Sequence, residues 1–296
     1  RSLVHVLAAD GSHTVELNHD MPLLTVGDWI LLDETGRFHR LLERLSLFAR
    51  KAAGTGVATQ LIAANIDTVF IVCSLNQDFN LNRIERYLVL AHQAGSEPVI
   101  VLSKSDTCEN PEQYVAQARS LDPLLQVMAV NCLDPASVSQ LEPWCRQSKT
   151  VALLGSSGVG KSTLVNTLSG SPVQETHGVR SGDDKGRHTT TGRSLHVLSS
   201  GGLLLDTPGM REIQLADSQQ GVEETFSEIT ELAGECRFSD CQHQDEPGCA
   251  VLQAIEAGHL DKRRLVSYRK LMREQAFNQA TLEERRSKDR QLGKFY

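Results

Sequence analysis

Apolar and polar residues alternate along the first fifty residues of the chain. Short alternating segments at 3–9, 13–18, 28–34 and 37–43 are separated by turn signals such as Asp10-Gly11 and Thr35-Gly36, which is typical of short strands joined by tight turns. We therefore predict a small β-barrel over residues 1–48. The chain begins at Arg1 directly in an alternating stretch, so we expect a preceding strand to be missing and the barrel to be incomplete.

Residues 44–60 are rich in basic and small side chains and contain two glycines. This composition predicts a mobile linker, which we place at residues 49–60.

From residue 66 the pattern changes to buried strands alternating with amphipathic helices. Strands are predicted at 68–75, 98–104, 124–131 and 149–157, helices at 82–95 and 111–121, and two further strands within 194–209 that meet at Gly201-Gly202. Strands that alternate with helices indicate a parallel sheet covered on both faces. We predict an α/β domain over residues 61–218, followed by a mostly helical domain over residues 219–296 with helices at 222–233, 250–258 and 261–277.

Composition limits the classes of function. The 296 residues carry a net charge of −7 and are 40% hydrophobic, which argues against a generally basic nucleic-acid-binding surface. Between residues 261 and 296, however, Lys and Arg outnumber Asp and Glu by about two to one, which suggests a local contact with a polyanion. Apolar runs stay well below the roughly 20 residues of a membrane helix, and no secretory signal pattern is found. We expect a cytoplasmic protein without a membrane partner.

Residues 155–162 match the pattern G-x-x-x-x-G-K-[ST] between a predicted strand and a predicted helix, the context in which this motif binds nucleotide phosphates. The backbone N–H groups of such a loop and the following helix N-terminus both point at the phosphates. Lys161 is expected to reach the β- and γ-phosphates, and Ser162 to ligate Mg²⁺. A chance glycine-rich turn is the alternative. The predicted phosphate contacts are Gly155, Ser156, Ser157, Gly158, Val159, Gly160, Lys161, Ser162 and Thr163.

The tetrapeptide 206–209, Asp-Thr-Pro-Gly, ends a predicted strand about fifty residues after this loop. Asp206 at such a position can hold Mg²⁺ through water, and Gly209 can offer its N–H to the γ-phosphate. A simple turn is the alternative. Met210 follows, where many nucleotide switches carry the Gln that orients the attacking water, so another residue must position the water.

The tetrapeptide 103–106, Ser-Lys-Ser-Asp, precedes the phosphate loop in the chain. Asp106 is expected to accept hydrogen bonds from the ring N–H and the amino group of guanine, while the Lys104 stem packs on the base. A solvated turn is the alternative for an isolated motif. Its place after a buried strand indicates a circularly permuted domain, since ligands of a parallel sheet bind at the carboxyl ends of strands whatever their chain order. Asn131 and Cys132 end the next strand and complete the predicted base pocket, together with Ser103.

Cysteines and one histidine gather between residues 236 and 249. Three thiolates and one imidazole form a full tetrahedral set for a structural Zn²⁺, and Pro247-Gly248 supplies a turn within it. Reduced cysteines in a small core are the alternative. The odd total of seven cysteines argues against a disulfide framework. The predicted ligands are Cys236, Cys241, His243 and Cys249.

The motifs together resemble the circularly permuted GTPases of the bacterial small-ribosomal-subunit biogenesis family, RsgA, also called YjeQ or YloQ. Matching segments run in family order from residue 62 to residue 251: IAANID, SKSD, GSSGVGKSTLVN, KGRHTTT, LLLDTPGMRE and CRFSDCQHQDEPGCAV. The resemblance implies an N-terminal OB-fold barrel, a permuted GTPase domain and a C-terminal zinc domain. One position departs from the family's N-K-x-D pattern: Ser103 replaces the Asn that bonds the base and braces the phosphate loop, and its shorter hydroxyl is expected to do only part of this.

The resemblance also implies how hydrolysis proceeds. Within the polar, glycine-containing loop 180–192, His188 would position the attacking water, and Thr189 or Thr190 would close on Mg²⁺ and the γ-phosphate, with Thr190 as the assigned Mg²⁺ ligand. A solvated loop histidine is the alternative. The catalytic set is thus His188, Lys161, Thr189 and Thr190. The segment after Gly209 leads directly into the zinc domain, so a γ-phosphate-dependent movement would be transmitted there.

The resemblance implies the small ribosomal subunit and its 16S rRNA as partners of a monomer that binds GTP and GDP with Mg²⁺. We expect a GTPase that acts as a late assembly checkpoint and is stimulated by the subunit. The alternative is an RNA-binding scaffold in which the nucleotide is a structural or sensing ligand. A phosphate-loop kinase is a weaker option, because no acceptor-binding lid is found.

Overall fold

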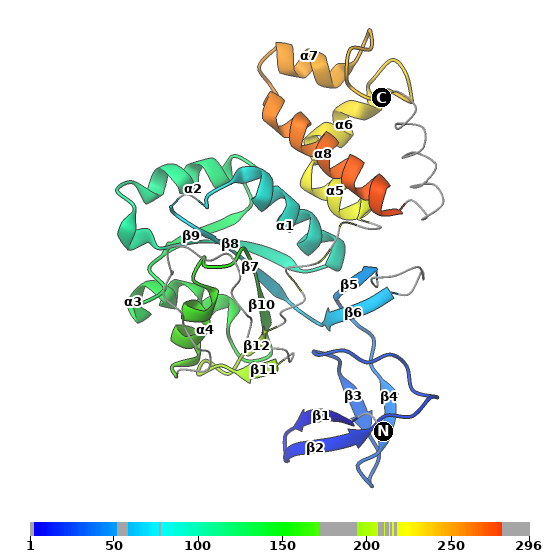
Figure 1. The fold of residues 1–296 in the computed structure, drawn as a ribbon, viewed down its shortest axis with the longest axis vertical. Coiled ribbons are helices and arrows are strands. Elements are labelled where there is room, and N and C mark those ends of the chain that lie inside the picture. Colours follow the sequence, from blue (N-terminus) through cyan, green and yellow to red (C-terminus); the bar gives the residue numbers. More distant parts are fainter. Residues whose placement is uncertain are drawn as a thin grey trace, which may run out of the picture.

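The computed structural model describes residues 3–51, 59–76, 78–171, 194–206, 210, 213, 215 and 218–279. Short hairpins lie at the N-terminal end of the molecule, a central sheet with its helices lies in the middle, and a group of helices lies at the opposite end (Figure 1). The helix α1 lies between the sheet and the C-terminal helices (Figure 1).

The N-terminal segment forms two separate hairpins. Strand β1 (Leu3–Ala8) pairs with β2 (Gly11–Glu16), and β3 (Ile30–Leu32) pairs with β4 (Phe38–Leu41), both antiparallel. Gly11 directly follows the first turn as the first residue of β2, and Gly36 in the second turn has a φ of 76°, which few other residues adopt. Among the described residues the two hairpins belong to different two-stranded sheets, and their hydrogen bonds do not close a barrel.

The structure has strands, and not a linker, at both ends of the linker predicted at residues 49–60. Strand β5 (Leu47–Lys51) pairs with β6 (Thr59–Ala64) as an antiparallel hairpin, while residues 52–58 lie outside the described residues. Phe48 and Ile62 from the two strands are buried in the main core, so burial of apolar area favours a strand pair where composition alone predicts a linker. The carbonyl of Ala64 lies only 2.1 Å from where a Cβ of Gly27 would stand, so glycine permits the close approach of the N-terminal segment to this hairpin.

The central sheet has six strands in the order β11-β12-β10-β7-β8-β9. All neighbours run parallel except the edge pair of β11 (Ser194–Val197) and β12 (Leu203–Asp206), which are joined at Gly201-Gly202 as predicted. The other strands are β7 (Thr68–Ser74), β8 (Glu97–Ser103), β9 (Gln126–Val130) and β10 (Thr150–Leu154). The parallel register aligns Ser74 with Ser103 and Ser103 with Val130, so the segments after these strands meet at one edge.

Both faces of the sheet are buried, as the near-continuous apolar strands predict. Along β7, Val69, Ile71 and Cys73 belong to one core cluster and Phe70 and Val72 to the other. Helices α1 (Leu81–Ala94) and α2 (Pro111–Arg119) cover the first face, and α3 (Pro135–Val138), η2 (Ser139–Trp144) and α4 (Lys161–Ser169) cover the second. The α/β part of the prediction is therefore confirmed.

The C-terminal helices are α5 (Gln219–Thr225), α6 (Ser227–Gly234), α7 (Ala250–Glu256) and α8 (Lys262–Gln279). The sequence predicts one helix over 222–233, but the helix breaks at Phe226, whose φ and ψ are −121° and 40°. The break turns the Phe226 ring into the core, where it packs edge-on against Tyr268 and beneath the Arg264 guanidinium. Among the described helices, each is too short or too polar to cross a bilayer.

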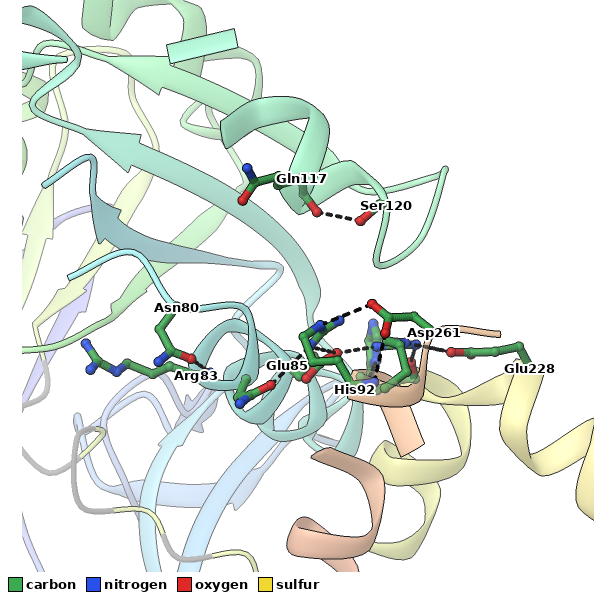
Figure 2. Close-up of polar contacts among 12 residues, drawn as sticks. Asn80, Arg83, Glu85, His92, Gln117, Ser120, Glu228 and Asp261 are labelled. Carbon is green, nitrogen blue, oxygen red and sulfur yellow. Dashed lines mark hydrogen bonds and ion pairs between the residues drawn. The ribbon is translucent and has the colours of Figure 1, made fainter. Parts of the chain in front are cut away.

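Helix α5 packs very closely on α1. The carbonyl of Val89 lies 2.2 Å from where a Cβ of Gly221 would stand, and the Gly221 N–H donates to Gln93 Oε1 at 3.0 Å. Figure 2 shows the polar contacts that continue this interface, with Glu85 and His92 of α1 facing residues of the C-terminal helices. The central domain and the helical domain thus share a packed interface.

Candidate functional site

The predicted phosphate loop joins β10 to α4 with the backbone that its glycines require. Gly155, Gly158 and Gly160 have φ values of 150°, 77° and 94°, in a region that side chains disfavour. A Cβ on Gly155 would also stand 2.3 Å from the Val72 carbonyl of the neighbouring strand. The loop is therefore fixed by close backbone packing at its start and by glycine conformations along its length.

Lys161 begins α4 and folds back over this loop. Its Nζ donates to the Gly155 carbonyl at 2.8 Å and to the Ser156 carbonyl. The ammonium is thus held at the mouth of the loop, where the N-terminus of α4 also contributes positive potential. Ser162 and Thr163 lie half-buried in the first turn of this helix, Val159 is buried, and Ser157 is exposed.

The predicted base-reading tetrapeptide lies directly beside the phosphate loop. Ser103 Oγ donates to the Val159 carbonyl at 2.6 Å, and Lys104 Nζ donates to the Gly158 carbonyl at 3.0 Å. Lys104 adopts a left-handed φ of 59°, and Asp106 in the following turn is exposed. Two segments separated by about fifty residues in the chain therefore form one site, as the permuted order predicts.

Ser103 itself is completely buried, with an exposed fraction of 0%. Its hydroxyl lies under the phosphate loop, and so it braces that loop in the way expected of the longer Asn side chain. The brace is therefore present with Ser103.

The segment after β9 forms the other wall. The Cys132 carbonyl accepts a hydrogen bond from Thr167 Oγ1 of α4 at 2.6 Å, and Asn131 Oδ1 accepts the Leu133 N–H at 3.0 Å. Burial raises the pKa of the Cys132 thiol to about 11, so the thiol is neutral at physiological pH. A hollow of about 380 Å³ next to it is lined by Leu133, Pro135, Thr163, Asn166, Thr167, Gly170 and Ser171.

The predicted switch residues fall largely outside the described part of the chain. His188, Thr189, Thr190 and Gly209 lie outside the described residues, and of Asp206 only the backbone is described. The backbone of Asp206 ends β12, which runs parallel to β10, so this residue reaches the same edge of the sheet as the phosphate loop. Met210 is buried in the main core.

Three residues at this edge are not suggested by any sequence motif. Arg83 donates from Nη1 to Ser156 Oγ at 2.7 Å and pairs with Asp78. Burial raises the pKa of Tyr87, an effect that the nearby Ser156 side chain partly opposes. Their place in the chain could have pointed to them, because α1 starts just after the carboxyl end of β7, at the edge where the sites of parallel sheets lie.

The cysteine and histidine cluster is a candidate metal centre. One ligand atom from each of Cys236, Cys241, His243 and Cys249 lies within 4.8 Å of all the others, and His243 Nδ1 lies 3.4 Å from Cys249 Sγ. Soft thiolates with one imidazole in such a group suit Zn²⁺. Gly248 has a φ of 80° in the turn that returns the chain to Cys249, as the sequence predicts.

A carboxylate organises the loop of this centre. Glu246 Oε1 accepts the Gln242 N–H at 2.9 Å, and Oε2 accepts the N–H groups of Gln244 at 2.7 Å and Asp245 at 3.2 Å. These backbone hydrogen bonds lower the pKa of Glu246 to about 2. His243, which lies between two of the donors, has a left-handed φ of 55°.

Comparison with known proteins gives one consistent result. The family model "RsgA GTPase" matches residues 41–216. The chain is 59% identical over 291 residues to small ribosomal subunit biogenesis GTPase RsgA 2 of Vibrio parahaemolyticus, covering 98% of this chain and 81% of the relative. It is 51% identical over 257 residues to small ribosomal subunit biogenesis GTPase RsgA of Mesorhizobium japonicum, covering 86% of this chain and 74% of the relative.

Solved structures agree with the sequence matches. The crystal structure of YjeQ from Thermotoga maritima has a TM-score of 0.69 at 26% identity and covers 92% of this chain and 94% of its own. The crystal structure of YloQ, described as a circularly permuted GTPase, has a TM-score of 0.65 at 25% identity and covers 94% of this chain and 92% of its own.

Proposed function

Because the chain belongs to the RsgA GTPase family, it is a GTP-hydrolysing enzyme, and we propose that it acts as a late assembly factor of the small ribosomal subunit. The family resemblance drawn from the motif order is confirmed. The main support for this proposal is that the predicted base-reading segment lies beside the phosphate loop at one edge of the sheet. Ser103 and Lys104 donate hydrogen bonds to the carbonyls of Val159 and Gly158 in that loop. Small-subunit biogenesis is the role named for the relatives from both organisms.

In the proposed site the phosphate loop and Lys161 bind the phosphates. Asp106 reads guanine, and the segment at Asn131 and Cys132 closes the base pocket. Support comes from the chemistry of the loop, since inward backbone N–H groups and a helix N-terminus favour anions. Ser162 and Thr163 follow Lys161 in the first turn of α4.

Hydrolysis in this proposal uses residues of the switch segments. Ser162, Asp206 and Thr190 would hold Mg²⁺, which when bound neutralises charge on the β- and γ-phosphates. His188 would position the attacking water, with Thr189 beside it and Gly209 at the γ-phosphate. The buried Met210 supports this assignment, because a side chain in the core cannot orient a water at the nucleotide.

We also propose that the Cys3His centre holds one structural Zn²⁺. A full set of four protein ligands leaves no open coordination position, so the metal would shape the helical domain and not take part in the reaction.

The outer domains are the proposed contacts with the ribosomal subunit and its 16S rRNA. We assign an OB-fold to residues 1–48, the GTPase domain to residues 61–218 and a zinc-binding helical domain to residues 219–296, with the β5–β6 hairpin connecting the first two. OB-folds bind RNA through one face and its loops, and basic side chains of the last helix can contact phosphates. We propose a cytoplasmic monomer.

The test is GTP hydrolysis by zinc-replete protein with and without small ribosomal subunits, with ATP as the control nucleotide. Strong stimulation by the subunit, confined to GTP, is the expected result. Equal rates with and without subunits, or equal use of ATP, would overturn the partner or the base-reading assignment respectively.

His188→Ala separates the checkpoint enzyme from the scaffold alternative. In an enzyme whose hydrolysis releases it from the subunit, loss of turnover with retained GTP binding leaves the variant bound to subunits. If the variant dissociates from subunits like the unmodified protein, nucleotide is a structural or sensing ligand and turnover is incidental.

A further inference from the structure

Arg83 lies in the first turn of α1 and contacts the phosphate loop from outside. Its Nη1 donates to Ser156 Oγ at 2.7 Å and also pairs with the Asp78 carboxylate. The helix is capped by Asn80, whose side chain accepts the Arg83 N–H at 3.2 Å, so the backbone that carries this arginine is fixed. In Figure 2 the Arg83 side chain points away from the side of α1 on which Glu85 meets the C-terminal helices.

Tyr87 of the same helix lies near Ser156. The Ser156 side chain partly opposes the rise in the pKa of Tyr87 that burial causes, and Tyr87 follows Arg83 by four residues, the spacing that places two side chains on one helix face. Tyr87 is largely buried, with an exposed fraction of 9%. One face of α1 therefore lies against the second residue of the phosphate loop, with Arg83 donating the hydrogen bond to it.

Ser156 connects this contact to the lysine of the loop. Its carbonyl accepts a hydrogen bond from Lys161 Nζ, as does the Gly155 carbonyl at 2.8 Å. The Ser156 side chain is thus held by α1 while its main chain holds the ammonium. A contact that fixes the orientation of this residue also fixes where the ammonium lies.

Arg83 forms its ion pair with the carboxylate of Asp78, whereas the thiol of the nearby Cys73 is not ionised. Burial raises the pKa of the Cys73 thiol to about 12, so this thiol carries no charge at physiological pH. Asp78 Oδ2 has no hydrogen-bond partner among the described residues, so Arg83 is the group that compensates this carboxylate next to a site for anionic phosphates.

We propose that Arg83 is a positioning residue for nucleotide binding, which fixes Ser156 and, through it, the Lys161 ammonium. The proposal rests on the assignment of residues 155–163 as the phosphate site. The loop surrounds the phosphates of GTP and GDP alike, so Arg83 strengthens the binding of both nucleotides and has little effect on the turnover number. An interaction made equally in the ground and transition states has this kinetic signature.

A surface ion pair without a role at the site is the competing interpretation, because Arg83 is about one-third exposed, with a side-chain exposure of 35%. The two interpretations differ in whether the side chain at position 83 affects nucleotide affinity, and a lysine at this position can distinguish them. A single nitrogen of Arg83 makes both contacts, and an ammonium with three protons can make the same pair. A neutral side chain of similar length cannot hold the carboxylate and the serine together.

The experiment measures the dissociation constants of GDP and of a non-hydrolysable GTP analogue by calorimetry, together with GTP turnover, for the unmodified protein and its variants. Arg83→Gln is expected to weaken both nucleotides about tenfold, the effect of one lost charge-assisted hydrogen bond, with turnover changed less than about twofold. Arg83→Lys is expected to recover most of the affinity. In a Ser156→Ala background, Arg83→Gln is expected to have little further effect, because the arginine acts through that hydroxyl.

Arg44→Ala is the matched control, since Arg44 forms a similar pair with Asp28 in the N-terminal segment and makes no described contact with the phosphate loop. Unchanged affinity in Arg83→Gln, or an equal loss with and without Ser156, would overturn the proposal. If the unmodified protein binds neither nucleotide, the phosphate-site assignment fails first. If it binds both and Arg83→Gln binds them equally well, the assignment stands and only the role of Arg83 is wrong.

Discussion

Glu85 and Arg264 form a buried ion pair across the contact between α1 and α8, with Arg264 Nη1 donating to Glu85 Oε1 at 2.8 Å (Figure 2). Glu85 is completely buried, and Arg264 has an exposed fraction of 5%. Arg263 donates to the same oxygen at 3.0 Å, and Arg264 also contacts Glu228 Oε1 at 2.7 Å and the Thr225 carbonyl at 2.9 Å. The helix that touches the phosphate loop through Arg83 is thus tied to the helical domain two residues later.

Replacing Glu85 should loosen this interface. Removing one partner of a buried pair typically destabilises a protein by about 3–5 kcal/mol, because the remaining charge stays buried. For Glu85→Gln we expect about 3 kcal/mol, at the lower end, since Glu228 still compensates Arg264. Urea denaturation gives the free energy of unfolding, and hydrogen exchange should rise in α5, α6 and α8.

Glu112→Gln on the exposed side of α2 is the control for Glu85→Gln, as it removes a carboxylate that is exposed to solvent. Equal unfolding midpoints for the two variants would show that the buried pair does not hold the helical domain.

Ser103 should act on nucleotide affinity and not on the choice of base. Its hydroxyl is buried under the phosphate loop and donates to the Val159 carbonyl at 2.6 Å. Ser103→Ala leaves that carbonyl without this donor, so we expect about five- to tenfold weaker binding of GDP, from the roughly 1 kcal/mol of a typical hydrogen bond. GDP and inosine diphosphate should weaken by the same factor.

Asp106 provides the contrast, because its proposed contacts are to the base itself. Asp106→Asn should weaken GDP strongly and improve xanthosine diphosphate, whose C2 carbonyl oxygen can accept a hydrogen bond from the new amide. For the Ser103→Ala prediction, Ser103→Thr keeps the hydroxyl and serves as the control. A change in the ratio of guanine to inosine binding in Ser103→Ala would assign base reading to this hydroxyl.

The sequence predicts those parts of this molecule that depend on neighbours in the chain. Alternating strands and helices, the glycines of residues 155–160 and the spacing of four metal ligands each follow from a local pattern. The β5–β6 hairpin is missed because burial of Phe48 and Ile62 overrides a composition that favours a linker. The break at Phe226 is missed because it arises from packing against α8. Arg83 with Ser156 and Glu85 with Arg264 join residues 73 and 179 positions apart, and no motif in the sequence pairs these positions.

Glu246 should determine metal affinity although it is not a ligand. Its carboxylate accepts three backbone N–H groups on both sides of His243, whose left-handed conformation is costly for a residue with a Cβ. Glu246→Gln removes the charge that these hydrogen bonds stabilise, so His243 should leave its position more readily. We expect roughly tenfold weaker Zn²⁺ binding, comparable to the loss of other groups that orient metal ligands, measured by competition with a chromophoric chelator.

Glu256→Gln, at the exposed end of α7, is the matched control for Glu246→Gln. Equal zinc affinities in the two variants would contradict the role of Glu246, while failure of the unmodified protein to retain zinc would contradict the metal site itself.

His92 should make the α1–α5 interface sensitive to acid. Its Nδ1 lies 2.9 Å from Thr225 Oγ1, and burial lowers its pKa from the ordinary 6.5, an effect that Glu224 and Asp122 partly oppose. The unfolded chain therefore binds the proton more tightly than the folded protein, so stability is fully present above about pH 6.5 and declines as the pH falls below it. His92→Gln retains a hydrogen-bonding group without a titrating one, and its melting temperature should fall less between pH 7.5 and 5.5 than that of the unmodified protein. Identical pH slopes for the two proteins would mean that His92 takes up its proton in the folded state as readily as in the unfolded chain.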